Sequence, residues 1–426
     1  MHRFGIAIVL AACATGAQVR TVTLKQAVDL AMQQNPEIAL ARLDERKADA
    51  AIQVARDPFV PKIGAGSGLA YSSGIPMSIE GSTPSIVQAQ ASQSIFNRRQ
   101  THMVAAAREN ARGVAIDTST KRDEVVLRTA LAYLDAERCA RMAETVHKQV
   151  ESLERIVQTV TLRVTDGREL PVEAKRANLD LARSRQRLQA LEADREYAED
   201  LLAALVGLDD GERVRVVVED RASAPLATSE EACAEAALKA SNEVRRLESA
   251  LTAKGFEVRA QKAAKLPTVD LVAQYALLGK FNNYDQFFSK FQRHNGQIGV
   301  SFVVPLFAGP AADAQAFQAA SDVARLRLEL ESARNRIAIE ARHSLQQVKQ
   351  AESAREVARL DLDVVREQLS VLLAQMEEGR VSLRRVEEAR LAEDGKWLAF
   401  IESNYAVETA RFRLLHQTGE LLAALK

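Results

Sequence analysis

Four stretches of the chain alternate between apolar and polar residues with a period of two, over about 62–71, 86–96, 268–278 and 297–307. In the third stretch, for example, Val269 and Leu271 alternate with Asp270. An alternation that lasts about ten residues predicts β-strands with one apolar and one polar face. Such strands fit either a tilted crossing of a membrane, with the apolar face towards lipid, or a half-buried sheet in a soluble domain.

The number of strands limits what they can build. A closed barrel takes about eight strands, so four cannot close one. Unpaired strand edges are not tolerated in lipid. If these strands cross a membrane, several copies of the chain must therefore share one barrel.

Each pair of strands is followed by a long stretch with helical periodicity, over about 97–206 and about 311–420. From Asn97 to Thr165 there is no proline, which predicts a helix of about 65 residues and about 100 Å. Beyond it, small and apolar residues recur at alternating intervals of four and three, as in Ala177, Leu181, Ser184, Leu188 and Leu191. This heptad spacing predicts long antiparallel coiled-coil hairpins. A plain coiled-coil rod would explain the helices equally well, but not the strands.

Landmarks recur in the same order in the two halves of the chain: Ala27–Gln34 aligns with Ala232–Lys239, Pro61 with Pro267, Ile95-Phe96 with Leu306-Phe307, and Gly167 with Gly379. Their spacing lengthens only gradually, as small loop insertions would cause. We therefore predict an internal duplication, with a first repeat over 18–226 and a second over 227–426. Each repeat would hold short helices, two strands and one helical hairpin.

The N-terminus is typical of a secretion signal, which we assign to residues 1–17. Arg3 supplies a positive charge, Phe4 to Ala12 is apolar, and small residues follow up to Ala17. The segment ending at Cys13 also matches a lipoprotein signal, in which Cys13 would be the lipid anchor. A cytosolic protein with an apolar start is the third interpretation. Beyond this segment no apolar run approaches 18 residues, so no membrane-spanning helix is expected.

Composition argues against catalysis and against nucleic-acid binding. Acidic and basic residues balance at 57 each in 426 residues, so there is no basic excess for nucleic acid. The six histidines are scattered without metal-ligand spacing, and no nucleophile elbow or phosphate-binding loop occurs. Cys139 and Cys233 are expected to be buried free thiols. We therefore predict a protein without cofactor or metal that is not an enzyme.

Two turns with a shared Gly-Arg pair separate the helices of the hairpins. They are Asp166, Gly167, Arg168, Glu169, Leu170 and Pro171, and Glu378, Gly379, Arg380, Val381, Ser382 and Leu383. Glycine suits the left-handed residue that ends a helix, and proline suits the first turn of the next helix. Each glycine is either only a helix cap or part of a tip that docks a partner protein.

These features, in this order, resemble the TolC-like outer membrane efflux protein family. The resemblance rests on Asn35-Pro36-Glu37, on Phe59-Val60-Pro61 and Lys265-Leu266-Pro267 before the strands, on Val304-Pro305-Leu306-Phe307, and on Leu205-Val206-Gly207. It implies a mainly α homotrimer in the outer membrane. Each subunit would give four strands to a twelve-stranded β-barrel and its helical hairpins to an α-barrel that reaches into the periplasm.

The resemblance also implies a function. The chain would be the channel subunit of a tripartite export or type I secretion system, passively conducting small molecules or proteins. An inner-membrane RND, ABC or MFS transporter would deliver them through a periplasmic adaptor protein. A periplasmic coiled-coil adaptor or scaffold is the alternative.

In that family acidic residues line the closed periplasmic aperture. The matching positions here, counted from the two turn glycines, are Glu173, Arg385 and Glu388. Arg385 departs from the acidic pattern. A mixed ring with Arg385–Glu388 or Arg385–Glu173 pairs is therefore expected to hold the closed state, and each exposed pair would contribute only about 0–1 kcal/mol.

Overall fold

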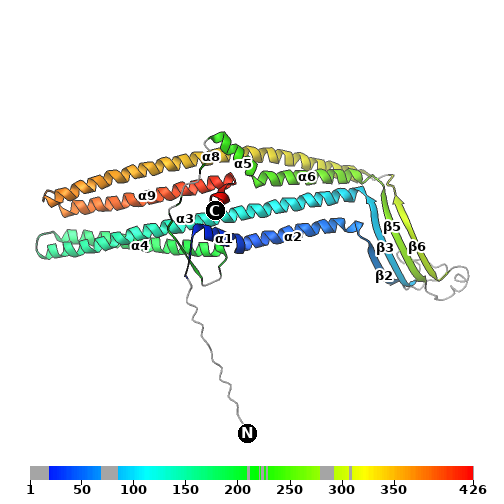
Figure 1. Ribbon diagram of the computed structural model, residues 1–426, viewed down its shortest axis with the longest axis horizontal. Helices are drawn as coiled ribbons and strands as arrows, with labels where there is room; N and C mark the ends of the chain where they lie inside the picture. The colour runs from blue at the N-terminus through cyan, green and yellow to red at the C-terminus, as the bar shows by residue number, and fades with distance from the viewer. Residues whose placement is uncertain are drawn as a thin grey trace, which may run out of the picture. The chain divides into compact units, whose positions relative to one another are not determined.

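The computed structural model (Figure 1) describes residues 19–68, 85–208, 212–219, 221, 225–226, 229–278, 292–306 and 309–425. The predicted signal peptide with Cys13, the end of the first predicted strand and Phe307 lie outside these residues. Contacts divide the chain into two compact units. The helical unit comprises 1–41, 119–241 and 334–426, and the strand unit comprises 42–118 and 242–333.

Long helices dominate the chain. Most lie wholly in one unit: α1 (Leu24–Gln34), α4 (Pro171–Val206), α5 (Glu230–Ala240), α9 (Leu383–Gln417) and α10 (Leu421–Ala424) in the helical unit, and α6 (Asn242–Ala263) in the strand unit. Three others continue from one unit into the other: α2 (Pro36–Arg56), α3 (Arg98–Thr165) and α8 (Gly309–Glu377). No helix within the described ranges is both long and apolar enough to cross a bilayer.

In the helical unit, α3 with α4 and α8 with α9 form the two antiparallel hairpins (Figure 1). Their heptad positions point inwards: Ala177, Leu181, Ser184 and Leu191 of α4 are buried. Leu398, Ile401 and Tyr405 of α9 share one apolar cluster with residues of α3 and α4. The predicted fold class, long packed helical hairpins with four strands, is confirmed.

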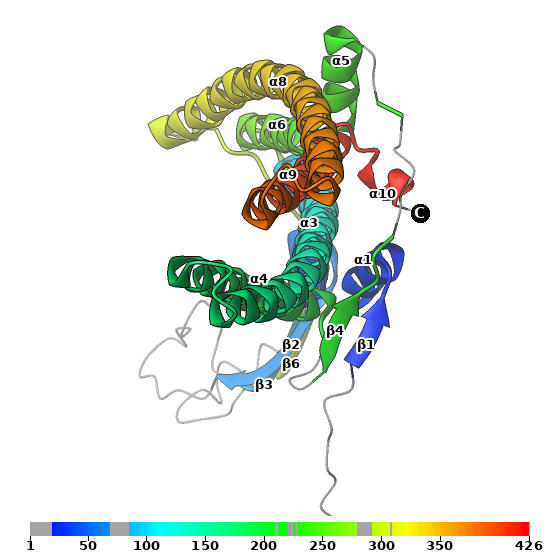
Figure 2. The ribbon, with the colours of Figure 1, turned by 90° about the vertical axis from the view of Figure 1, so that its left-hand side faces the viewer.

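A small parallel sheet that the sequence pattern did not indicate also belongs to the helical unit. β1 (Val19–Val22) pairs with β4 (Arg213–Val216). Figure 2 shows the two strands side by side with α1 next to them. Val22, Val214 and Val216 are buried in the same cluster as Tyr133 of α3 and Leu202 of α4.

The Asn35-Pro36-Glu37 motif joins the end of α1 to the end of α4. The Asn35 side chain donates from Nδ2 to the Leu205 carbonyl at 2.8 Å and accepts from the Glu37 N–H at 2.9 Å. Gly207 caps α4 with φ 77°, and a Cβ there would lie 2.8 Å from the Gln34 carbonyl oxygen. Only glycine fits this joint, because both its backbone angle and its surroundings exclude a side chain.

The second half of the chain contains a matching close approach. Gly419 has φ 74°, and a Cβ there would lie 2.7 Å from the Cβ of Ala240 at the end of α5. The element order α1, α2, β2, β3, α3, α4 is followed by α5, α6, β5, β6, α8, α9. The division into repeats over 18–226 and 227–426 stays a prediction, as do its boundaries.

The strand unit holds a four-stranded antiparallel sheet in the order β2-β3-β5-β6 (Figure 1). Its strands are β2 (Lys62–Gly68), β3 (Ser85–Asn97), β5 (Thr268–Leu278) and β6 (His294–Val303), and the short helix η1 (Asp57–Phe59) precedes β2. β6 begins and ends earlier than the predicted 297–307. Pro305 follows closely and has no N–H to continue the ladder.

The two faces of this sheet differ as the alternation predicted. Register places Ile63, Ala91, Ala273 and Ile298 in one row, and Gly64, Gln90, Gln274 and Gln297 in the next. On the apolar face Ile63 is 79% exposed, Ile298 78% and Phe302 64%. Within the described chain this apolar face is therefore exposed and does not pack on a core. In a half-buried sheet of a soluble domain, the apolar face would be covered.

Candidate functional site

The two predicted tips have the same backbone geometry. At the first, Gly167 has φ 69°, and the N–H of Arg168 donates to the Arg163 carbonyl at 2.8 Å. At the second, Gly379 has φ 74°, and the N–H of Arg380 donates to the Gln375 carbonyl at 2.9 Å. Each bond spans five residues, which is the pattern of a helix ending in a left-handed glycine. Both glycines are therefore helix caps, whatever else the tips do.

The side chains of the tips are largely exposed. Leu170 is 67% exposed just before Pro171 starts α4. Arg380 pairs with Glu378 at 3.0 Å, and Glu169 lies 3.8 Å from Arg163. Within the described residues, Arg168 forms no ion pair. The tips thus present an apolar side chain and basic groups that could contact another protein.

One arginine links the two hairpins near their tips. Arg384 Nη1 lies 3.4 Å from Glu173 Oε1 of α4, and its Nε lies 2.9 Å from Glu388 Oε1 of α9. The hydrogen bond to Glu388, with the nearby charge of Glu173, raises the pKa of this guanidinium. Glu173 also accepts from Arg176 at 3.0 Å.

Two of the three predicted aperture residues thus lie together, but their shared partner is Arg384 rather than Arg385. In the part of the chain that the structure describes, Arg385 is exposed and forms no ion pair. Whether Glu173, Arg385 and Glu388 line an aperture stays a prediction. The ion pairs with both glutamates are made by Arg384. The i,i+4 spacing of Arg384 and Glu388 was the signal that could have found it.

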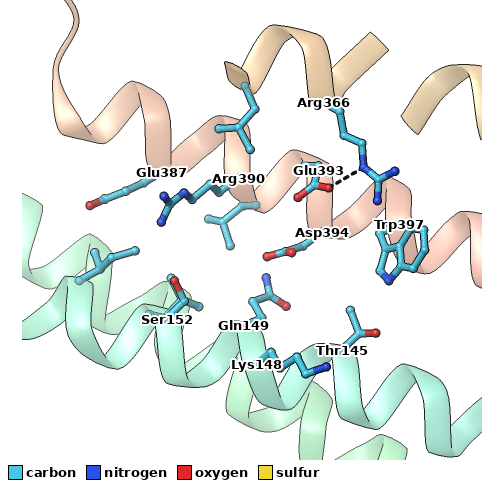
Figure 3. Close-up of a pocket in the computed structure, with 14 residues that line it drawn as sticks. Thr145, Lys148, Gln149, Ser152, Arg366, Glu387, Arg390, Glu393, Asp394 and Trp397 are labelled. Carbon is cyan, nitrogen blue, oxygen red and sulfur yellow. Dashed lines mark hydrogen bonds and ion pairs between the residues drawn. The ribbon is translucent and has the colours of Figure 1, made fainter. Parts of the chain in front are cut away.

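A cavity of about 350 Å³ opens between α3, α8 and α9 in the helical unit (Figure 3). Arg366 of α8 reaches over the ring of Trp397, 4.9 Å from its centroid, and donates to Glu393 at 3.1 Å. Asp394 points into the same space, towards Gln149 of α3. No sequence pattern indicated this cavity, because its residues come from three separate helices.

The carboxyl groups of the cavity are held partly out of water. Burial, with the nearby charge of Glu393, raises the pKa of Asp394 to about 6, although Arg390 opposes the shift. Burial followed by the charge of Glu169 also raises the pKa of Glu387. Both groups therefore ionise less readily than an exposed carboxyl group.

A buried ion network ties α3 to α9. Glu137 of α3 is fully buried. Its carboxylate oxygens lie 2.5 Å from Arg221 Nη2 and 3.3 Å from Arg141 Nη2. The same Arg221 nitrogen lies 2.9 Å from Glu408 of α9. The N–H of Glu219 also donates to Glu137, at 3.3 Å. Arg221, which follows β4, is thus held by acidic groups of both helices.

Tyr133 completes this region of the helical unit. Its hydroxyl donates to the Val217 carbonyl at 2.7 Å, and Arg221 lies 5.8 Å from its ring centroid. Burial, with the charges of Glu219 and Glu137, raises the pKa of Tyr133 to about 12, so the hydroxyl remains a donor at neutral pH. No sequence pattern indicated this site, because Glu137 and Arg221 lie 84 residues apart in the chain.

Three comparisons bear on what kind of protein this is. The outer membrane efflux protein family model matches residues 27–208. The outer membrane efflux protein BepC of Brucella suis biovar 1 (strain 1330) is 23% identical over 416 residues, covering 96% of this chain and 88% of BepC.

Solved structures share the fold. CusC gives a TM-score of 0.77 at 15% identity, covering 93% of this chain and 91% of CusC. The CmeC outer membrane channel of Campylobacter jejuni also gives 0.77, at 16% identity, covering 93% of this chain and 86% of CmeC. At such low identity these structures establish the fold alone. Taken with the family match over residues 27–208 and the relative that extends along nearly the whole chain, they show that this protein is similar to outer membrane efflux proteins in sequence and in fold.

Proposed function

We propose that the protein is the outer-membrane channel subunit of a tripartite export system. It lies in the outer membrane, with its helical hairpins extending into the periplasm, as expected for the outer membrane efflux proteins to which it is similar. Small molecules or proteins pass through it passively, delivered by an inner-membrane transporter through a periplasmic adaptor protein. The chain itself performs no catalytic step in this proposal.

The observation that carries the proposal is the four-stranded sheet, because within the described chain nothing packs against either of its two faces. Its apolar face suits contact with lipid, and its polar face suits a water-filled lumen. Both outer strands, β2 and β6, have an edge that no strand of the described chain covers. Three copies of the chain, joined edge to edge, would satisfy these edges in one twelve-stranded barrel.

Within the helical unit, the exposed tips and the residues around Arg384 would have two different tasks. The tips around Gly167 and Gly379 would dock the adaptor. Glu173, Arg385 and Glu388, together with Arg384, would surround the periplasmic aperture. Exposed ion pairs are weak, so a partner could open such an aperture at modest cost.

The first experiment combines mass and conductance on one sample. The protein would be extracted in detergent, its oligomeric mass measured, and its single-channel conductance recorded in planar bilayers. A conducting trimer is expected. A monomer that does not conduct would refute the channel and favour a coiled-coil adaptor or scaffold.

A second experiment tests the tips. The changes Arg168→Glu and Arg380→Glu should abolish cross-linking to the adaptor while trimers persist. Arg187→Glu is the matched control, because Arg187 is exposed on α4 away from the turn. Cross-linking that survives both tip changes would show that the adaptor docks elsewhere.

A further inference from the structure

A row of three glutamines crosses the polar face of the sheet. Register pairs Gln90 of β3 with Gln274 of β5, and Gln274 with Gln297 of β6. Gln297 Nε2 donates to Gln274 Oε1 at 2.6 Å, which joins the two amides across the strands. All three glutamines are exposed. Gly64 of β2 is the fourth member of the row and adds no side chain.

The neighbouring row towards the loops is also uncharged. It consists of Gly66, Gln88, Ala276 and Asn295. A hollow of about 580 Å³ lies over this part of the sheet; Gly64, Gly66, Gln88, Gln90 and Gln274 lie in its wall, with Lys62 at its helix-side end. The two rows therefore form a hydrated surface of amides and bare backbone.

Among the described residues of this face, charged side chains lie near both ends of the strands. Arg293, two residues before Asn295, lies at the loop end and donates to the Leu278 carbonyl at 3.1 Å. The other charged residues lie at the end of the strands that joins the helices. Lys62 pairs there with Asp57, and Asp270 stands opposite Ser94 and Ser301. Between that end and Asn295, the described residues of this face carry no ionisable side chain. A stretch of wall without ionisable side chains adds no fixed charge of its own that would sort solutes by sign.

We propose that the row of Gln90, Gln274 and Gln297 makes the middle of the strand-lined part of the conduit a neutral, hydrogen-bonding zone for cargo of either charge. An amide both donates and accepts hydrogen bonds, so it keeps the wall hydrated for solutes of either sign. Three subunits would place three such rows around one lumen. The inference rests on the proposed channel, and it assigns selection by charge to positions outside these two rows.

The test is ion selectivity, measured as a reversal potential across a KCl gradient in planar bilayers. Near 0.1 M salt, charges influence ions over about 10 Å, so introduced groups act across a narrow lumen. Gln274→Glu should raise the cation-to-anion permeability ratio at least about threefold, and Gln274→Lys should lower it comparably. Gln274→Asn is the matched control and should leave the ratio at its wild-type value.

A second design avoids variants that fail to assemble. Gln274→Cys would be assembled first and then treated with a negatively or a positively charged thiol reagent. Cys139 and Cys233 are buried, so the treated wild-type protein serves as the background. The two reagents should shift the permeability ratio in opposite directions.

The outcomes separate this inference from the proposed channel. No conductance from the wild-type trimer would overturn the channel itself. Conductance whose selectivity ignores the charge placed at position 274, by mutation and by reagent alike, would overturn only the amide row. Opposite shifts with opposite charges would support it.

Discussion

Removing Arg221 should destabilise the helical unit strongly, because it leaves a fully buried carboxylate poorly compensated. Arg221 contacts Glu137 at 2.5 Å and Glu408 at 2.9 Å, and only 18% of its side chain is exposed. Breaking a buried ion pair by removing one partner costs about 3–5 kcal/mol. Arg141 and the Glu219 N–H still face Glu137, each at 3.3 Å, so we expect the lower end of that range for Arg221→Met.

Removing the second charge should restore part of the loss. In the double variant Arg221→Met, Glu137→Gln, the buried carboxylate is replaced by a neutral amide of similar shape. A buried neutral amide lowers the free energy of unfolding less than an unpaired buried charge does. The double variant should therefore be more stable than Arg221→Met alone. Glu137→Gln alone should cost less than Arg221→Met, because Arg221 keeps Glu408.

The assay is the loss of helical circular dichroism on heating, in detergent, at one fixed scan rate. Arg221→Met should lower the midpoint by about 5 °C or more, and the double variant should recover part of this. Arg187→Glu, a charge change on an exposed face, should leave the midpoint unchanged. Equal midpoints for Arg221→Met and the wild type would refute the reasoning, as would a double variant less stable than Arg221→Met.

Three further predictions concern the helix ends, the cavity and the aperture. Gly207→Ala should destabilise the fold by about 2–4 kcal/mol in thermal unfolding, from left-handed strain and a backbone clash, whereas Gly395→Ala inside α9 should be neutral or stabilising. Because the folded state raises the pKa of Asp394 to about 6, its ionisation destabilises the protein as pH rises towards that value. Asp394→Asn should therefore raise the unfolding midpoint at pH 8, and this advantage should vanish towards pH 4; a pH-independent gain would contradict this account. Arg384→Ala should raise the single-channel conductance of the isolated protein more than Arg385→Ala does, because Arg384 makes the ion pairs with Glu173 and Glu388; a larger effect of Arg385→Ala would contradict this reasoning.

The long helices and the strands could be predicted from the sequence because each follows a periodic pattern of apolar residues. The strand alternation around Leu271 and the heptads around Leu181 each extend over many positions. A single exception therefore does not hide the pattern. The turn glycines were predictable for a different reason. Gly167 and Gly379 mark a backbone angle that other residues adopt only at a cost.

What escaped prediction depended on single positions. β1 and β4 have four residues each, too few for an alternation to be recognised. Glu137 lies in a helix where acidic residues usually face water, and only the distant Arg221 makes its burial tolerable. Arg384 and Arg385 are neighbours in sequence but point about 100° apart on a helix, so counting from a turn could not separate them.

The joints at Gly207 and Gly419 constrain sequence drift in unequal ways. At the first, the obstacle is the carbonyl of Gln34, which every amino acid possesses. No exchange at position 34 could make room there, so lineages descended from this gene should keep glycine at 207. At the second, the obstacle is the Ala240 methyl group itself. A glycine at 240 would remove it, so positions 240 and 419 are free to change as a pair within the limits of the backbone angle. The two halves of the chain, similar in plan, should therefore accumulate substitutions at these joints by different routes.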